Sequence, residues 1–191
     1  LSTNRLVLSV DGVRLNNAIY RGGNIHNVIS ISPTNIENTE VIMGSASVLY
    51  GSDAIGGVMN FYTKKANLSN NSDPKIQLNL HSRYSSASIE KMYHFDFNYG
   101  LQKIAFLSSF SKSQFGNLTM GKNGPSEYLR PNYVGVNDAG EDILIQNSNS
   151  RVQRNTAYDQ VNFMQKIFYK PTENLNIDLG IHFSKSSNIP R

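Results

Sequence analysis

The residues that could carry out catalysis or bind a metal are few and widely spaced. The four histidines, His26, His81, His94 and His182, form no pair at the spacing that places two metal ligands on one helix face. The chain has no cysteine, which excludes disulfides, thiolate metal sites and cysteine nucleophiles. It also lacks the Gly-x-Ser-x-Gly elbow of a serine hydrolase. We therefore expect no enzyme, no metal site and no resident cofactor.

Three glycines, Gly51, Gly56 and Gly57, bracket a short segment that could be read in two ways. The interval from Gly51 to Gly56 has the spacing of a phosphate-binding loop. However, Gly57 and Val58 stand where such a loop needs Lys and then Ser or Thr. The glycines are better interpreted as turn positions that allow a positive φ and a close approach of the backbone.

A polar segment, residues 16–27, is rich in Asn and Gly and is predicted to be an exposed loop. Four of its residues could bind a flat or anionic ligand. Tyr20 offers a stacking face, Arg21 can grip a carboxylate with two hydrogen bonds, and Asn24 and His26 can donate or accept. His26 could also be an axial iron ligand if the ligand were haem. In the alternative, Arg21 and His26 only tie the loop to neighbouring structure.

The composition excludes several classes of protein. The 191 residues include 18 Lys and Arg and 14 Asp and Glu, and no run of Lys or Arg exceeds two residues, so no nucleic acid partner is expected. The 10 Tyr and 9 Phe argue against disorder, although 24 Asn and 23 Ser are present. The longest apolar run is four residues, Ile104 to Leu107, whereas a membrane helix needs about 20. The sequence starts at Leu1 without a signal peptide, so we expect an internal fragment or a processed form.

After residue 75 apolar and polar side chains alternate with a period of two, which predicts long strands with two different faces. The strands are predicted from Lys75, Tyr93 and Leu175, with longer and less regular ones near Lys103–Ser113 and Tyr158–Lys170. One face is apolar: Ile76, Leu78, Tyr93, Phe95, Phe97, Tyr99, Ile177 and Ile181. The other is polar: His81, His94, Asp96, Asn98, Asn176, Asp178 and His182. In the irregular strands Ala105, Leu107, Met164 and Phe168 put apolar groups on both faces.

The connections between these strands alternate in length. A tight turn at Gly100–Gln102 is followed by a long loop over residues 115–154 and a second tight turn around Pro171. Strands of about ten residues exceed the usual five or six, and short turns at one rim with long loops at the other are typical of outer-membrane barrels. The pattern favours a membrane barrel over a soluble β-protein. The apolar face should then meet lipid, and the polar histidines should be solvated in the lumen.

The first third of the chain has a different pattern, with short predicted strands and Gly-containing turns. It predicts a strand over Arg5–Val10, a hairpin turn at Asp11-Gly12 and a return through Val13–Leu15. Further strands are predicted over Glu40–Met43 and Val58–Thr63, with one short helical turn over Ser45–Tyr50. Residues 67–74 are a polar connector.

Three blocks of this first third resemble the plug domain of TonB-dependent outer-membrane receptors. They are Val7–Asn16 (VLSVDGVRLN), Ile36–Gly44 (IENTEVIMG) and Ser45–Phe61 (SASVLYGSDAIGGVMNF), followed by Thr63-Lys64-Lys65. The motif residues that would be structural in such a plug are Asp11, Gly12, Gly44, Tyr50, Gly51, Asp53, Gly56 and Gly57. The resemblance also implies that the loop with Tyr20, Arg21, Asn24 and His26 is an apical plug loop that contacts cargo.

The resemblance implies a mainly β fold in which a plug domain precedes the start of a large antiparallel transmembrane β-barrel. Residues 1–66 would be the C-terminal part of the plug, residues 67–74 the linker, and residues 75–191 about the first five barrel strands. The implied function is import of a scarce nutrient across the bacterial outer membrane, with a ferric siderophore, haem or cobalamin as cargo. Implied partners are the inner-membrane TonB complex and outer-membrane lipid, and an accessory surface lipoprotein is a further candidate.

The sequence departs from the family at Met43-Gly44-Ser45, where the family usually has Arg-Gly-Pro. That Arg commonly pairs with acids on the inner barrel wall, so the resemblance does not carry the usual plug-to-barrel ion pair over to this chain. The alternative function is that of a non-transporting β-rich surface binder or adhesin. A TonB box, which the sequence does not contain, would separate the two if the full gene encodes one.

Overall fold

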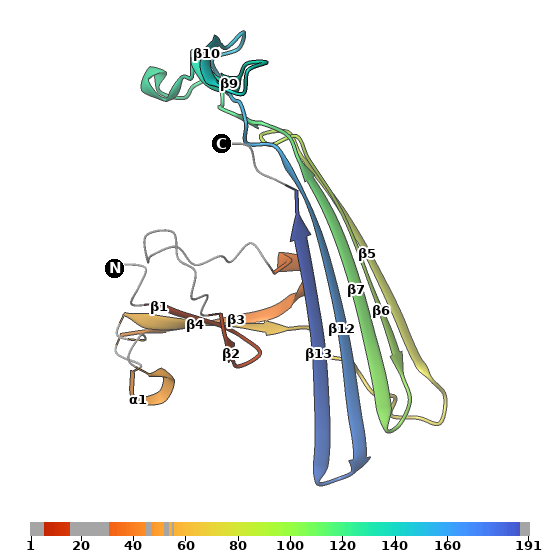
Figure 1. Ribbon diagram of the computed structural model, residues 1–191. Coiled ribbons are helices and arrows are strands. Elements are labelled where there is room, and N and C mark those ends of the chain that lie inside the picture. The colour runs from red at the N-terminus through yellow and green to blue at the C-terminus, as the bar shows by residue number, and fades with distance from the viewer. Residues whose placement is uncertain (1–5, 16–30, 45–46, 52–53, 55, 188–191) are drawn as a thin grey trace. The chain divides into compact units, whose positions relative to one another are not determined.

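The computed structural model describes residues 6–15, 31–44, 47–51, 54 and 56–187 (Figure 1). The chain divides into two compact units. One comprises Leu1–Gln77, Asn98–Ser108 and Met164–Ile181, and the other comprises Leu78–Phe97, Ser109–Phe163 and His182–Arg191. None of the helices in the described ranges is long and apolar enough to cross a membrane.

The first unit contains a small four-stranded sheet, here called the plug sheet, with strand order β2-β1-β4-β3. Its strands are β1 (Leu6–Val10), β2 (Val13–Arg14), β3 (Ile36–Met43) and β4 (Gly57–Thr63). β1 pairs with β4 in parallel, and the pairs β1–β2 and β3–β4 are antiparallel. A 3-10 helix, η3 (Pro33–Asn35), leads into β3, and a single helical turn, α1 (Ser47–Tyr50), follows it.

The predicted hairpin at Asp11-Gly12 is confirmed. The φ angles of Asp11 and Gly12 are 49° and 82°, as a tight hairpin with two left-handed central residues requires. The short helical turn and the strand ending at Thr63 are also confirmed. The prediction for β3 was too short, because the strand begins at Ile36 rather than Glu40. β3 is an exposed edge strand, so its first half lacks the apolar alternation from which a strand could be predicted.

The plug sheet has an apolar cluster on each face. Val7 and Val58, which are direct partners in the β1–β4 ladder, pack with Ala54 on one face. Leu8, Val10 and Phe61 pack on the other face. Because strand side chains alternate, neighbouring residues of β1 serve the two clusters in turn, and both faces of this small sheet are covered.

The long strands form one five-stranded sheet, here called the wall, with order β13-β12-β7-β6-β5. Its strands are β5 (Lys75–Ser85), β6 (Glu90–Gly100), β7 (Ile104–Phe115), β12 (Tyr158–Thr172) and β13 (Leu175–Ser186). Successive strands run in opposite directions (Figure 1). Short turns join β6 to β7 and β12 to β13 at one end, and the long connection leaves from the other end. The predicted turn around Pro171 is displaced to residues 173–174, since Pro171 lies inside β12.

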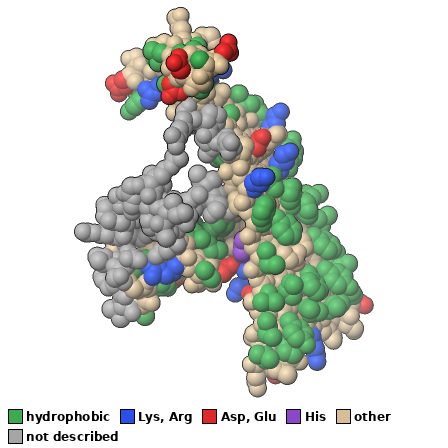
Figure 2. All heavy atoms as spheres, viewed as in Figure 1, with side chains coloured by type: hydrophobic (Ala, Val, Ile, Leu, Met, Phe, Trp, Pro, Cys, Tyr) green, Lys and Arg blue, Asp and Glu red, His purple; other side chains and the backbone are tan. Residues whose placement is uncertain are grey.

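Burial confirms the alternation predicted for β6. His94, Asp96 and Asn98 are buried, whereas Phe95 and Phe97 between them are exposed, as is Tyr93 before them. Figure 2 shows hydrophobic side chains spread over the outer surface of the long strands. On β5 and β13 both faces are exposed, because these are the two edges of the wall. His94 corrects one expectation: it is not a solvated side chain but is only 5% exposed.

The apolar residues that break the alternation of β7 and β12 have a common role. Ala105 and Leu107 of β7 and Met164 of β12 form a buried cluster with Ala66, which follows the plug sheet in the chain. Leu68 and Phe168 pack against the same cluster. The polar face of the wall is therefore apolar where the connector from the plug sheet crosses it.

The long connection between β7 and β12, residues 116–157, has its own secondary structure, which the sequence did not predict. It contains β8 (Leu118–Thr119), η5 (Ser126–Tyr128), β9 (Asn132–Val136), β10 (Asp142–Gln146) and β11 (Val152–Gln153). These strands form two small antiparallel ladders, β9–β10 and β8–β11. The segment is too rich in Gly, Asn and Pro to show a sustained period, although each ladder is regular.

Candidate functional site

The predicted apical loop lies outside the described residues. This holds for Tyr20, Arg21, Asn24 and His26, and also for the motif residue Asp53. The other motif residues are described, and they surround the plug sheet. Positive φ angles are found at Gly12, Gly44, Gly51 and Gly57, while Gly56 lies in the bend before β4.

Asp11 is the best-connected residue of the motif. Its Oδ1 accepts a hydrogen bond from the backbone N–H of Thr63 at 2.8 Å, and its Oδ2 accepts one from the Thr63 hydroxyl at 2.6 Å. The Asp11 side chain therefore ties the β1–β2 turn to the end of β4. Oδ2 also lies 2.7 Å from Nζ of Lys166, which projects from β12 of the wall.

These contacts favour the charged form of Asp11. Burial of the carboxyl group opposes ionisation. The hydrogen bonds from Lys166 and from the side chain and backbone of Thr63, together with the charge of Lys166, outweigh burial and lower the pKa of Asp11. The carboxyl group of Asp11 is therefore ionised at neutral pH, and the plug sheet carries a negative charge at its contact with the wall.

A second polar cluster links β1, β3, β4 and α1. The Asn60 amide donates hydrogen bonds to Glu40 at 3.0 Å and to the Tyr50 hydroxyl at 3.2 Å, while its oxygen accepts from Ser9. The Tyr62 hydroxyl donates to the same Glu40 carboxylate at 3.0 Å. The hydrogen bonds from Asn60 and Tyr62 lower the pKa of Glu40, and the bond to Glu40 raises the pKa of Tyr62. The cluster joins Tyr50 of α1 to Asn60 of β4.

The buried polar residues of the second unit form a network along the wall. Nδ1 of His94 lies 2.8 Å from the hydroxyl of Ser111, and Nε2 lies 3.1 Å from Asp96. Asn79 donates to the other oxygen of Asp96 at 2.6 Å. The trio of Ser, His and Asp is of the kind found in hydrolases, but the Ser111 hydroxyl is fully buried within the wall. The arrangement fixes the side chains of three neighbouring strands to one another.

The long connection carries a hollow of about 360 Å³. Its lining includes Met120, Tyr128, Arg130 and Arg151. Arg151 donates from Nε and Nη2 to the backbone oxygen of Met120, at 3.2 and 2.8 Å, and so has a fixed position. Arg130 is exposed. Two guanidinium groups and a phenol in one hollow suit an anionic or aromatic ligand.

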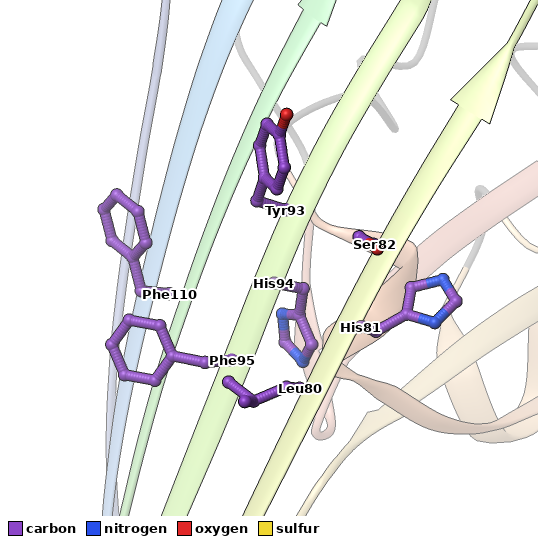
Figure 3. A pocket seen from close by; sticks show the side chains of 7 residues that line it. All are labelled: Leu80, His81, Ser82, Tyr93, His94, Phe95 and Phe110. Carbon is purple, nitrogen blue, oxygen red and sulfur yellow. The ribbon is translucent and has the colours of Figure 1, made fainter.

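A second hollow, of about 350 Å³, lies on the wall between β5, β6 and β7 (Figure 3). Leu80, Tyr93, Phe95 and Phe110 provide its apolar lining, and the rings of Phe95 and Phe110 are 5.8 Å apart. Tyr93 and Phe95 belong to the exposed apolar face, so this hollow opens on the side predicted to meet lipid.

Sequence reasoning missed Lys166, both arginines of the loop hollow and the buried network around His94. Lys166 had one available signal: it falls on the same face as Asn162 and Met164 in the two-residue alternation of β12. Its partner Asp11 is 155 positions away, and no local pattern connects them. Within the described residues, no group of three or more His, Asp and Glu side chains is placed to hold a metal ion.

Comparison with known proteins gives a consistent answer. Residues 1–58 match the family model "TonB-dependent Receptor Plug Domain". The chain is 44% identical over 71 residues to the vitamin B12 transporter BtuB of Vibrio vulnificus (strain CMCP6), a match that covers 37% of this chain and 11% of the relative. It is 47% identical over 60 residues to the ferric aerobactin receptor of Klebsiella pneumoniae, covering 31% of this chain and 8% of that receptor.

Solved structures extend the likeness to the wall. The copper transporter OprC superposes with a TM-score of 0.67 at 16% identity, over 95% of this chain and 23% of its own. The FrpB iron transporter of Neisseria meningitidis (F3-3 variant) gives 0.67 at 17% identity, over 93% and 24%. The chain thus spans about a quarter of these solved structures and about a tenth of the curated relatives. The plug match and the relatives together indicate a TonB-dependent receptor of the bacterial outer membrane, and the solved structures show the matching fold, with plug-domain sequence ahead of barrel strands.

Proposed function

We propose that the receptor to which this chain belongs captures a scarce nutrient complex at the cell surface and imports it across the outer membrane. The observation that carries this proposal is the plug motif, whose hydrogen-bonded core the structure describes around Asp11 and Asn60. Two relatives that match part of the chain are named as a vitamin B12 transporter and a ferric aerobactin receptor. The cargo is accordingly proposed to be a ferric siderophore, haem or cobalamin.

Two places on the chain are proposed to contact cargo. The first is the apical plug loop with Tyr20, Arg21, Asn24 and His26, which has the residue types for a flat or anionic ligand. The second is the hollow of the long connection, where Arg130 and Arg151 could meet carboxylates or catecholates at the outer rim. Both places join a cation to an aromatic ring, and this shared chemistry favours an iron chelate of the carboxylate or catecholate type.

The proposed mechanism is binding followed by gating, without bond cleavage. Cargo binds first, and the inner-membrane TonB complex then pulls on the plug to open a path through the barrel. The apolar face of the wall, with Tyr93, Phe95 and Phe97, is proposed to rest against outer-membrane lipid. An accessory surface lipoprotein is a further proposed partner.

The test uses the full-length receptor in an outer membrane. Binding of ferric siderophores, haem and cobalamin is measured first, and uptake of each bound compound is then compared in cells with and without TonB. We expect one class to bind and to enter only when TonB is present. Binding without TonB-dependent uptake of any compound would instead support a surface binder or adhesin.

Variants of the two proposed contact places locate the cargo. Tyr20→Ala and Arg21→Ala probe the apical loop, and Arg130→Ala probes the hollow of the long connection. Lys122→Ala is the matched control, because it removes an exposed cation from the same connection outside the hollow. Unchanged affinity in all three folded test variants would exclude both places.

A further inference from the structure

Two sets of contacts join the plug sheet and its connector to the wall within the first unit. The first, here called the latch, comprises Asp11, Thr63 and Lys166. The second, here called the clamp, comprises residues 66–69 with Asn98, Gly100 and Leu101 of the wall. We propose that the latch is the releasable fastening of the plug sheet, and that the clamp stays closed when the latch opens. This goes beyond the proposed function, because it concerns contacts within the chain and its test needs neither cargo nor TonB.

Lys166 is placed for this contact by the strand beside it. Its side chain is only 6% exposed, and its Nζ reaches Asp11 at 2.7 Å. A Cβ at Gly180 of β13 would lie 3.2 Å from each of Cδ, Cε and Nζ of this lysine. The absent side chain at Gly180 therefore leaves the space through which Lys166 reaches the plug sheet.

The carboxylate of Asp11 is held in position by contacts other than the one to Lys166. Asp11 has a left-handed backbone, and both of its carboxylate oxygens accept hydrogen bonds from Thr63 of the same sheet. If Lys166 withdraws, Asp11 keeps these bonds and its 26% exposed side chain can be solvated. Opening the latch therefore leaves no buried, unpaired charge on the plug sheet, which makes the contact reversible.

The latch also reverses the charge arrangement expected from the family resemblance. That resemblance implies a plug arginine that pairs with acids of the wall, but Met43 stands at the position and is 87% exposed. Here the acid belongs to the plug sheet and the cation to the wall. The chain thus has a charge contact between plug and wall, although the usual arginine is absent.

The clamp is built from different interactions. The Asn98 side chain accepts a hydrogen bond from the backbone N–H of Asn67 at 2.8 Å and donates one to the Asn67 carbonyl at 3.1 Å. The N–H of Ser69 donates to the carbonyl of Leu101 at 3.0 Å. Ala66 lies in the buried apolar cluster of the wall. Opening the clamp would expose apolar surface and strand backbone groups at once, so it should resist a force that breaks the latch.

Hydrogen–deuterium exchange of the purified full-length receptor in detergent tests the proposal. Lys166→Met removes the charge and keeps much of the side-chain volume. We expect exchange in peptides covering residues 6–15 and 57–63 to accelerate about tenfold, with residues 66–74 unchanged. The matched control is Lys170→Met, since Lys170 lies on the same face of β12 and has no acidic partner within the described part of the chain.

A second variant keeps the proposal testable if Lys166→Met does not fold. Gly180→Ala fills the space beside Lys166 without touching Asp11, and it should accelerate exchange in the same two peptides. The double variant Asp11→Asn with Lys166→Met should exchange no faster than the faster of the two single variants, because both substitutions remove the same contact. If residues 6–15 exchange as slowly in Lys166→Met and in Gly180→Ala as in the Lys170→Met control, the latch is overturned. Faster exchange at residues 66–74 in the same variants would overturn the separate role of the clamp.

Discussion

Replacing Gly100 by Ala should loosen the connector between the plug sheet and the wall. Gly100 is the last residue of β6, and the connector passes directly over it. A Cβ at this position would lie 2.1 Å from the carbonyl oxygen of Asn67, which is 1.3 Å short of the 3.4 Å at which ordinary contact begins. The obstacle is backbone, so a change of side-chain rotamer cannot relieve the overlap.

The size of the effect follows from the contacts that such a shift would break. Moving Asn67 away from the wall removes its two hydrogen bonds with Asn98, worth about 1 kcal/mol each. Overpacking of a close contact typically costs about 1–3 kcal/mol, and the two effects overlap because the shift relieves the strain. We therefore expect the free energy of unfolding to fall by about 3 kcal/mol, with no change in the strands away from the connector.

The assay combines urea unfolding of the full-length receptor in detergent with hydrogen exchange of residues 66–74. Gly121→Ala is the control, because a Cβ at Gly121 meets nothing within 4 Å. We expect Gly100→Ala to lower stability and to accelerate exchange in the connector, and Gly121→Ala to do neither. Equal behaviour of the two variants would refute the close approach of the connector to β6.

Three further outcomes are expected. Phe97→Arg on the apolar face of the wall should lower the folding stability by about 2–4 kcal/mol if Phe97 lies near the middle of the membrane. Asp178→Arg on the polar face should lower it much less, and the yields of folded receptor for the two variants measure the difference. The pKa of Asp11 is lowered in the folded protein, so its contribution to stability should be complete above the unfolded pKa of about 3.9 and should be lost as pH falls through the lower folded pKa. Urea unfolding at a series of pH values measures this loss. Asp11→Asn should flatten the dependence of the free energy of unfolding on pH. Protease added to intact cells should cut within residues 116–157, and cleavage confined to residues 171–174 would mean that the wall is inverted.

Local patterns in the sequence predicted the elements well wherever one face of an element is buried. The alternation from Tyr93 onward predicted which side chains of β6 are buried, because a strand with one covered face has to alternate. The Asp-Gly pair predicted the β1–β2 turn, since few residues tolerate two left-handed positions in succession. The edge strand β3 was predicted too short for the opposite reason, because it buries little and carries a weak pattern.

Contacts between distant segments could not be predicted in this way. Ala105, Leu107 and Met164 looked like irregularities in the alternation, and their meaning appears only with Ala66 packed against them. The ion pair of Asp11 and Lys166 joins a turn to a strand from the other end of the chain, and neither residue is unusual in its own neighbourhood. The four predicted apical-loop residues stay a prediction, because they lie outside the described residues.

The two open edges of the wall impose an order on how such a barrel can form. β5 and β13 each present a row of backbone N–H and C=O groups without a neighbouring strand in the described sheet. Lipid cannot satisfy these groups, so both edges must be paired before the sheet rests in a membrane. Pairing across a closing barrel joins strands far apart in sequence, which is slow and leaves aggregation-prone edges exposed meanwhile. Biogenesis of the receptor should therefore depend on factors that shield β5 until the barrel closes.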